Sequence, residues 1–371
     1  MKIMEHIKTK YLVVGAGVGG LAAGARLKER GETDFLIVDK CESLPVNLQN
    51  GVHYLHSNDF GTPFEFELKE ITATEEIWDP RKDEFKKAAN IPEMMDYSMK
   101  VMGLRHPSSI MDPSNRNWKT YIPMSNNMND LLQGYHDYIG KEHFKWNKYL
   151  ERVATREKCA EFSDCIIDYE KMISTAPLNK FGTIVDINLG SDYGELEFNH
   201  QALNITNYRT KNIVPNWLVG IYISDNRFPV YRITILNNII SMESLTKLTA
   251  SDEHITKYHL DRYFDYELDT KQEYTWETGR IWGLTKDDRN VVVKLFEERD
   301  IFLLGRYGEW DGKRTIDTTV IKANQIIDSI AIIESNIKRT GWHHSDEWIK
   351  ENLKYRDKNG RFIKREINKN I

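Results

Sequence analysis

The sequence predicts an α/β protein in which a Rossmann-like nucleotide-binding domain, built on a parallel sheet, carries an inserted α+β domain with an antiparallel sheet. Three stretches predict this fold. A strand, a glycine-rich turn, a helix and a second strand follow one another over Tyr11–Lys40, a β-rich region covers Asn199–Asn238, and a further strand–glycine turn–helix unit lies at Asp300–Ile333. Strands that alternate with helices are typical of parallel sheets, and strands separated by short turns are typical of antiparallel ones.

Gly15, Gly17 and Gly20 form the pattern G-x-G-x-x-G between an apolar, β-prone run and a helical one. In a dinucleotide site the first glycine allows a tight turn, the second lets the backbone approach a pyrophosphate, and the third lets the helix pack on the strand. Asp39 ends the second strand nineteen residues after Gly20, where an acid accepts a hydrogen bond from an adenosine ribose. Such an acid disfavours the 2′-phosphate of NADP, and NAD and FAD both remain open.

Composition limits the classes of function. The chain has 371 residues and a net charge of −5, of which residues 336–371 carry +5 and the remainder −10. An acidic body is a poor nonspecific binder of nucleic acid, because that affinity comes largely from neutralising phosphates. The three cysteines, Cys41, Cys159 and Cys165, have no metal or redox spacing. With no export sequence and no apolar run near eighteen residues, we expect a cytoplasmic protein that does not enter a membrane.

The basic C-terminal tail, residues 336–371, reads as an amphipathic helix followed by a basic turn. Such a segment is usually a solvated face or a mobile end. The alternatives are an arm that joins copies of the chain in a homo-oligomer, or a contact to nucleic acid. If the substrate were a modified nucleobase in DNA, the duplex would contact this tail.

Between these landmarks, residues 60–130 are expected to be mostly helical. The helix that follows has apolar residues at every third or fourth position: Met128, Leu131, Leu132, Tyr135 and Ile139. Short sheet elements are expected at Trp146–Arg152 and Asp164–Ile173. The region Glu253–Leu284 is rich in aromatic residues, which either pack in a core or line a site for a flat or sugar ligand: Tyr258, Tyr263, Phe264, Tyr266, Tyr274, Trp276 and Trp282. Asp317 is expected to cap the last helix.

Two histidines, His53 and His56, lie three residues apart in the loop Asn50–Asp59. A metal site would need further ligands, and the sequence has no other His, Cys or Glu cluster at a suitable spacing, so we expect no metal. Without metal the stretch is either a loop with one buried and one exposed histidine or part of a binding site.

Four later segments resemble motifs of the FAD-dependent superfamily that contains UDP-galactopyranose mutase, protoporphyrinogen oxidase and the amine oxidases, and they match the mutase branch best. Gly51–Asp59 is similar to the mutase motif G-x-H-x-F-H-T-N-D. Ile173–Leu178 resembles the superfamily's T-x-P turn. The stretch from Tyr222 to Thr234 resembles its Y-x-P-x-D and F-Y-R-x-T segment, and Gly305–Trp310 resembles its closing G-R-x-G-x-W/Y motif.

This resemblance implies FAD as the cofactor. It implies that Gly15, Gly17, Gly20 and Asp39 hold the ADP half, and that the loop with His53 and His56 lies against the flavin. The segment from Gly305 through Arg306 to Asp317 would lie there too. Arg232 and Arg306 would face flavin or substrate anions, the alternative being surface or interdomain salt bridges. The catalytic candidates are therefore His53, His56, Arg232 and Arg306.

We expect a discontinuous FAD-binding domain (1–58, 140–195 and 286–335), a substrate domain (59–139 and 196–285) and the basic tail. The tyrosines and arginines that grip a sugar-nucleotide diphosphate in the mutases cannot be identified from the sequence. The resemblance therefore favours an FAD-dependent oxidoreductase that acts on a small polar substrate through flavin N5. The alternatives are a mutase-like isomerase that uses reduced FAD on a nucleotide sugar, a flavin-binding protein without catalysis, and a flavoenzyme that acts on a modified nucleobase.

Overall fold

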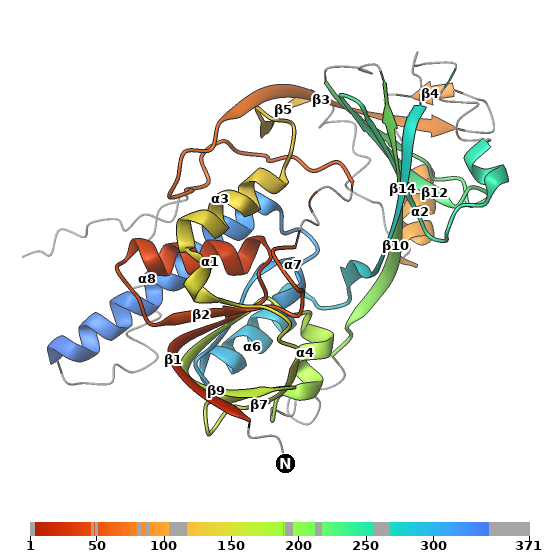
Figure 1. The fold of residues 1–371 in the computed structure, drawn as a ribbon. Coiled ribbons are helices and arrows are strands. Elements are labelled where there is room, and N and C mark those ends of the chain that lie inside the picture. Colours follow the sequence, from red (N-terminus) through yellow and green to blue (C-terminus); the bar gives the residue numbers. More distant parts are fainter. Residues whose placement is uncertain are drawn as a thin grey trace, which may run out of the picture.

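The computed structural model describes residues 4–45, 48, 51–79, 84–86, 90–103, 117–187, 189, 196–211, 217–254, 261 and 268–340. The predictions for the basic tail beyond residue 340 and for Tyr258, Tyr263, Phe264 and Tyr266 lie outside the described residues. Two sheets form two lobes, one with helices packed on the sheet and one dominated by strands (Figure 1).

The first sheet is built on parallel strands in the order β6-β2-β1-β9, with β15 also beside β9. The antiparallel strands β8 and β7 complete it. The strands are β1 (Glu5–Val14), β2 (Phe35–Val38), β6 (Phe144–Lys145), β7 (Leu150–Ala154), β8 (Cys159–Phe162), β9 (Cys165–Ser174) and β15 (Ile301–Leu303). The strands expected near Trp146–Arg152, Asp164–Ile173 and Asp300–Leu304 are confirmed within a few residues.

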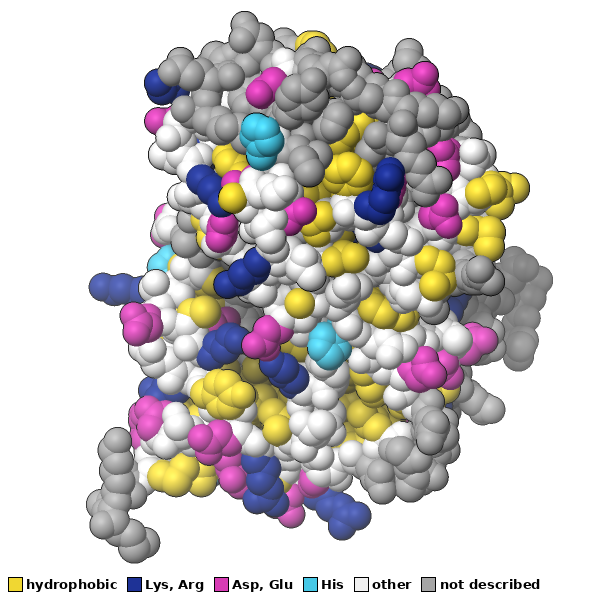
Figure 2. Space-filling model, turned by 90° about the vertical axis from the view of Figure 1, so that its right-hand side faces the viewer, with side chains coloured by type: hydrophobic (Ala, Val, Ile, Leu, Met, Phe, Trp, Pro, Cys, Tyr) yellow, Lys and Arg dark blue, Asp and Glu magenta, His cyan; other side chains and the backbone are white. Residues whose placement is uncertain are grey.

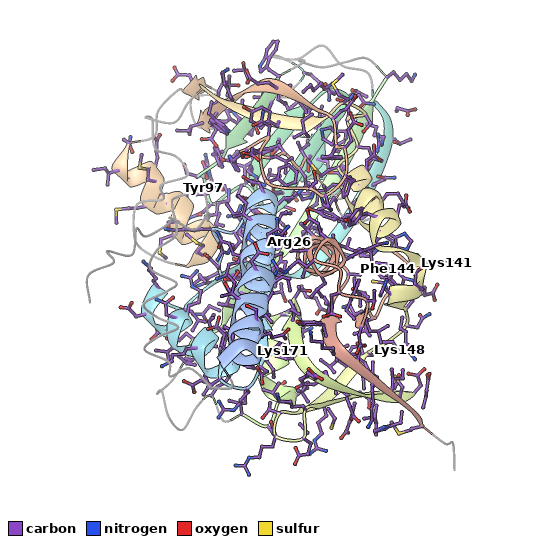
Figure 3. All side chains as sticks on the ribbon, turned by 90° about the vertical axis from the view of Figure 1, so that its left-hand side faces the viewer. Arg26, Tyr97, Lys141, Phe144, Lys148 and Lys171 are labelled. Carbon is purple, nitrogen blue, oxygen red and sulfur yellow. The ribbon has the colours of Figure 1, made fainter. Side chains whose placement is uncertain are left out.

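Helices cover both faces of this sheet. On one face lie α1 (Val18–Glu29), α3 (Asn129–Ile139) and α8 (Ile316–Thr340), which pack on Tyr11 and Val13 of β1. On the other face α4 (Leu178–Ile184) and α6 (Lys286–Glu297) share a core with Leu12 and Val14. Successive residues of β1 are thus buried on opposite faces, as a strand covered on both sides requires. Figure 3 shows α8 next to α1, which is seen nearly end-on, and Arg26 of α1 pairs with Asp328 of α8 at 2.9 Å.

The second sheet has the order β14-β10-β13-β12-β11-β3-β4, with β5 on the other part of β3. It is antiparallel except where β11 meets β3. Its strands are β3 (Leu68–Asp79), β4 (Glu84–Lys86), β5 (Asn117–Pro123), β10 (Asn199–Thr210), β11 (Leu218–Tyr222), β12 (Val230–Leu236), β13 (Ile239–Ser244) and β14 (Leu268–Trp282). One helix, α2 (Ile91–Met102), packs on the face that carries Tyr222 and Tyr231.

The antiparallel sheet predicted for Asn199–Asn238 is confirmed, but the mostly helical structure predicted for residues 60–130 is wrong. The described part of that segment contains β3, β4 and β5, with α2 as its one long helix. The glutamates of β3 favour a helix locally, yet β3 pairs with β11 on one edge and with β5 on the other. Strand propensity depends on such tertiary context more than helix propensity does. The helix α3 is confirmed, with Leu131, Leu132, Tyr135 and Ile139 buried against α1.

A charge cluster joins the start of β15 to β9 and to Lys158 between β7 and β8. Asp300, which precedes β15, accepts from Lys158 at 2.5 Å and from Lys171 at 2.9 Å. Burial opposes ionisation of Asp300, but the two lysines outweigh it and hold the pKa of this carboxyl below its ordinary value. A carboxyl with a lowered folded-state pKa stabilises the fold above its unfolded pKa, and this contribution is lost as the pH falls through the folded value.

We therefore expect Asp300→Asn to lower the free energy of unfolding at pH 7 and to have less effect as the pH falls below about 4, the ordinary pKa of an aspartate. Urea denaturation of both proteins between pH 7 and pH 3 measures this. A difference in unfolding free energy that stays constant over the range would contradict the role given to the two lysines.

Candidate functional site

The parallel strands of the first sheet end side by side. Val14 of β1 pairs in register with Val38 of β2 and with Ser174 of β9, and Ser174 pairs with Leu303 of β15. The residues that follow the strands therefore gather at one edge. In open α/β sheets ligands bind at this carboxyl edge, so we take it as the cofactor side of the site.

The glycine loop has three different steric environments. Gly15 has φ +99°, and a β-carbon there would lie 2.1 Å from the hydroxyl oxygen of Thr175. A β-carbon on Gly20 would lie 1.8 Å from the carbonyl oxygen of Gly15. A β-carbon on Gly17 would meet no described atom within 4 Å. Gly15 and Gly20 are thus required by the protein's own packing, whereas the space beside Gly17 is left open for another molecule.

Asp39 lies against this loop. Its two carboxylate oxygens accept from the backbone N–H of Ala16 at 2.6 Å and of Cys41 at 2.8 Å. The carboxylate joins the end of β2 to the glycine turn. Each carboxylate oxygen can accept a second hydrogen bond, so the group can also receive a ligand hydroxyl.

The helix α1 begins directly behind this loop, with Gly17 as its N-cap and no acidic side chain in its first turn. Its N-terminal N–H groups and the positive end of its dipole are therefore directed at the loop without compensation from a carboxylate of that turn. The start of α8 lies beside it: a β-carbon on Gly19 would be 3.3 Å from a methyl group of Thr319. Two helix N-termini thus meet at the carboxyl edge.

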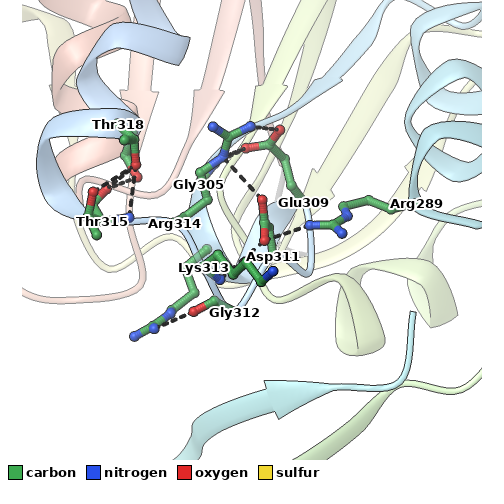
Figure 4. Close-up of polar contacts among 11 residues, drawn as sticks. Arg289, Gly305, Glu309, Asp311, Gly312, Lys313, Arg314, Thr315 and Thr318 are labelled. Carbon is green, nitrogen blue, oxygen red and sulfur yellow. Dashed lines mark hydrogen bonds and ion pairs between the residues drawn. The ribbon is translucent and has the colours of Figure 1, made fainter. Parts of the chain in front are cut away.

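The second glycine turn contains α7 (Gly305–Gly308) and is held rigidly. Gly305 has φ +87°, and its N–H donates to the buried carboxylate of Glu309 at 3.2 Å. Arg314 binds that carboxylate through two nitrogens, at 3.0 and 2.9 Å (Figure 4). Asp311 also pairs with Arg289 at 2.6 Å. The two parallel hydrogen bonds from Arg314 to Glu309 fix the loop more firmly than a single hydrogen bond would.

Asp317 lies inside the first turn of α8, which begins at Ile316, so the expectation that Asp317 is the N-cap is wrong. Thr315 occupies the position before the helix, and its backbone N–H donates to the hydroxyl of Thr318 at 2.9 Å. Asp317 is nevertheless buried, and its Oδ1 has no hydrogen-bond partner among the described residues. A buried acceptor without a partner is costly unless something else supplies a donor.

Arg306 follows Gly305 in the second glycine turn. Its side chain is exposed and donates to the carbonyl of Gly312 at 2.5 Å. Burial of the surrounding region lowers the pKa of Arg306, and the charges of Arg280 and Arg232 act in the same direction. The turn is joined to the end of β14, since Tyr307 donates to the carbonyl of Gly279 at 3.3 Å.

Arg232 lies on the second sheet beside a β-bulge. The pairing of β12 with β13 shifts by one residue between Val230 and Arg232, so Tyr231 has no direct partner in the ladder. The bulge brings two consecutive side chains to the same carboxylate: Tyr231 donates to Glu243 Oε2 at 2.9 Å, and Arg232 pairs with Oε1. Bulges commonly re-aim side chains in this way near functional sites. The Nε of Arg232 has no partner among the described residues.

A second arginine shares the same acid. Arg280 of β14 lies 3.5 Å from Glu243 and stacks over the ring of Tyr231, 4.4 Å from its centroid. Burial opposes ionisation of Glu243, but the two arginines lower its pKa, so it is a carboxylate. Two guanidinium groups thus share one carboxylate, and the carboxyl of Glu75 lies near Arg232 as well. Over the described residues of the face beside β14 and β10, basic and acidic side chains are interspersed (Figure 2).

Phenols surround this arginine pair. Burial raises the pKa of Tyr54, Tyr97, Tyr222 and Tyr231, so each remains a neutral hydrogen-bond donor at physiological pH. Tyr222 donates to Glu75 of β3 at 2.6 Å. Burial also raises the pKa of Glu75. We call Arg232, Arg280, Glu243 and these four tyrosines the arginine–tyrosine cluster.

The loop with the two histidines lies against the same sheet. A β-carbon on Gly51 would be 3.7 Å from Ile205 and from the hydroxyl of Ser241, and 4.0 Å from His53 Nε2. His53 is half-buried, whereas His56 is exposed and packs edge-on to Tyr54 at 5.2 Å between ring centroids. Within the described part of the chain, no group of three or more His, Cys, Asp or Glu side chains could hold a metal ion. Nor does any described helix have the length and apolarity to cross a bilayer.

The structure therefore brings Gly15, Gly17, Gly20, Asp39, Gly305 and Asp317 to one edge. Among the described residues Arg306 forms no hydrogen bond with Arg232, but its neighbour Tyr307 donates to the carbonyl of Gly279, the residue before Arg280. Sequence reasoning missed Arg280, Glu243, Tyr97 and Glu75. Tyr222 and Tyr231 belong to the Tyr222–Thr234 motif, but the bulge that orients Tyr231 cannot be recognised from the sequence. Glycine at position 279, within a strand-like run of aromatic residues, could have drawn attention to Arg280.

Comparison with known proteins gives the fold. No family model matches the sequence, and no curated protein matches it. Reduced UDP-galactopyranose mutase is similar in structure, with a TM-score of 0.64 and 15% identity over 87% of this chain and 95% of that chain. A fatty acid isomerase from P. acnes that produces CLA has a TM-score of 0.56 and 13% identity, over 86% and 98%. Putrescine oxidase bound to putrescine has a TM-score of 0.54 and 10% identity, over 88% and 100%. The chain thus has the fold of these enzymes, and the Rossmann-like fold with a second, antiparallel sheet predicted from the sequence is confirmed.

The contrast between Gly20 and Gly17 can be tested by stability. We expect Gly20→Ala to lower the free energy of unfolding by about 3 kcal/mol or more, because the new methyl group overlaps a backbone oxygen and α1 must move. Gly17→Ala is the matched control; with φ −77° and no neighbour within 4 Å, it should change stability by less than about 1 kcal/mol. Chemical denaturation of ligand-free protein measures both, and equal losses would contradict the assignment of the open space.

Proposed function

We propose that this protein is an FAD-dependent enzyme that acts on a small anionic molecule bound between the second glycine turn and the antiparallel sheet. The observation that carries the proposal is the pairing of two features. An open helix N-terminus lies at the carboxyl edge of the parallel sheet, and the second glycine turn at the same edge bonds through Tyr307 to the carbonyl of Gly279, the residue before Arg280 of the arginine–tyrosine cluster.

The described residues fit FAD. The open space beside Gly17 and the N-terminal N–H groups of α1 suit a pyrophosphate. Asp39 would accept from a ribose hydroxyl. The unpaired Oδ1 of Asp317 would accept from a further hydroxyl of the cofactor. Residues Gly305–Arg306 would approach the flavin end, as the family resemblance implies.

The structural neighbours support the same cofactor and an enzymatic role. Their names are those of a mutase, an isomerase, a reductase-like protein and an oxidase, and two of them describe the redesign of cofactor binding in putrescine oxidase. When bound, FAD supplies an isoalloxazine ring that accepts or returns a hydride and that, in its reduced form, can act as a nucleophile.

The arginine–tyrosine cluster supports an anionic substrate. Guanidinium groups bind phosphate or carboxylate through two parallel hydrogen bonds, and the free Nε of Arg232 is one available donor. The neutral phenols next to the arginines add no negative charge, and those of Tyr231 and Tyr222 donate to Glu243 and Glu75. The residues of this chain would bind and orient the substrate and would exclude water from it, while Glu243 keeps the two guanidinium groups in place.

Two reaction classes are consistent with such a substrate. Hydride transfer, the oxidoreductase chemistry expected from the sequence, remains our first proposal because it requires no particular leaving group. The cluster itself favours the second candidate, a mutase-like isomerisation of a nucleotide sugar, since a diphosphate would match three arginines better than a neutral amine would. The cationic substrate named for putrescine oxidase would be repelled here.

Cofactor binding can be tested directly. We expect the purified protein to be yellow and to release FAD on denaturation, and we expect Gly17→Val to abolish flavin binding while the protein stays folded, because the new side chain fills the open space. Absorbance near 450 nm, chromatography of the released cofactor and circular dichroism measure these outcomes. A folded Gly17→Val variant with full flavin content would exclude the proposed pyrophosphate position.

Substrate class and reaction can be separated in a second experiment. UDP should perturb the flavin spectrum of the loaded protein, putrescine should not, and Arg280→Met should weaken the UDP response at least about tenfold, the equivalent of one charge-assisted contact. Arg152→Met is the matched control, because Arg152 is exposed and pairs with Glu161 far from the cluster. A stronger response to putrescine than to UDP would contradict the anionic substrate. Incubation of the reduced protein with UDP-galactose, followed by chromatography, then shows whether a ring isomer forms.

A further inference from the structure

A lysine is buried in the second lobe and bonded only through backbone acceptors. Lys100 lies near the C-terminal end of α2, is 8% exposed, and donates from Nζ to the carbonyls of Ile223, Asp225 and Val230 at 3.1, 2.8 and 2.8 Å. An ammonium group has three N–H donors and no acceptor. All three donors are therefore used, and Lys100 is not available to bind a substrate itself.

The three acceptors belong to one hairpin connection. Ile223 directly follows Tyr222 at the end of β11, and Val230 directly precedes Tyr231 at the start of β12. The loop is closed by a hydrogen bond from the N–H of Ile223 to the carbonyl of Tyr231 at 2.9 Å. The β-bulge between Val230 and Arg232 begins at one of these acceptors. Lys100 thus fixes the backbone directly after Tyr222 and directly before Tyr231, where the bulge starts.

A second residue of the same helix contacts the same tyrosines. Tyr97, which precedes Lys100 by three residues and lies on α2 (Figure 3), is fully buried and packs edge-on to Tyr222 and Tyr231, with ring centroids 5.6 and 6.3 Å apart. One face of α2 therefore holds the hairpin twice, through the ammonium at the loop and through the aromatic ring at the strands.

This arrangement is expensive for a lysine that only fills space. Burial lowers the pKa of Lys100 to about 7, and the field of Asp225 only partly opposes this. The carboxylate of Asp225 is itself engaged by Arg227 at 2.6 Å. An apolar side chain of similar length would bury the same methylene groups without the cost of a desolvated charge. It would, however, remove the donor that Ile223, Asp225 and Val230 share, and the carbonyl of Asp225 would keep only the N–H of Phe228.

From this geometry we propose that Lys100 is a positioning residue for the anionic substrate. It holds the β11–β12 loop and its bulge so that Tyr231 and Arg232 face the same point beside Glu243. The inference rests on the proposed function and adds a residue that touches neither cofactor nor substrate.

The test uses the flavin-loaded protein, in which the cofactor site is filled, and inorganic pyrophosphate as the probe of the arginine–tyrosine cluster. We expect Lys100→Met to weaken pyrophosphate binding, followed through the flavin spectrum, by about tenfold, the size of about one lost charge-assisted contact. Lys171→Met is the matched control: it removes a lysine ion pair of the first sheet and should leave pyrophosphate binding unchanged while lowering stability.

A double-mutant cycle with Arg232→Met distinguishes the positioning of Arg232 by Lys100 from a merely structural role of Lys100. If Lys100 acts by placing Arg232, its removal should cost little further affinity once Arg232 is gone, so the two effects should not add. Additive losses would overturn the proposal, as would unchanged binding by a folded Lys100→Met variant. Lys100→Gln, which keeps two N–H donors, replaces the methionine variant if that protein does not fold, with the same two outcomes. Failure of wild-type protein to bind pyrophosphate would instead contradict the anionic substrate of the proposed function.

Discussion

A β-carbon on Gly20 would lie 1.8 Å from the carbonyl oxygen of Gly15, so α1 can lie this close to the end of β1 only with glycine at that position. The consequences extend through the lobe. Because α1 starts so near the strand, its N-terminus is directed at the carboxyl edge, where Asp39 ties the loop to β2. Gly19 then lies against Thr319, which brings the start of α8 to the same edge. One close backbone approach thus sets the positions of two helix N-termini and of Asp317 between them.

The second lobe is organised around the carboxylate of Glu243 rather than around a close backbone contact such as that between Gly20 and Gly15. Among the described residues Glu243 is the one carboxylate bound by both Arg232 and Arg280, and it also accepts from Tyr231. Without it, two half-buried guanidinium groups would repel each other; with it, they are held side by side. A charge pair away from water adds little net stability. This is consistent with the proposal that the pair holds two arginines in place for an anionic substrate.

Sequence reasoning succeeded where the determinant is local. The glycine turn, Asp39 at the end of β2 and the apolar periodicity of α3 are all specified within about thirty residues, and the structure has each element where it was predicted. It failed where pairing partners are distant. β3 is a strand because β5 and β11 flank it, and Arg280 meets Glu243 only because β14 and β13 both pair with β10. The bulge at Tyr231 depends on a register shift between β12 and β13, which no local sequence pattern predicts.

This division between local and distant determinants matches a division of labour between the lobes. The residues proposed for the cofactor lie in two short glycine turns at strand ends, so they can be kept while much of the rest of the chain changes. Except for Tyr54, those proposed for the substrate lie on β11, β12, β13, β14 and α2, and those on strands depend on the register of their neighbours. A change in one loop, such as the β11–β12 connection, can therefore re-aim two ligand-facing side chains at once. Proteins of this fold have names as different as mutase, isomerase and oxidase, so the fold alone does not determine the reaction.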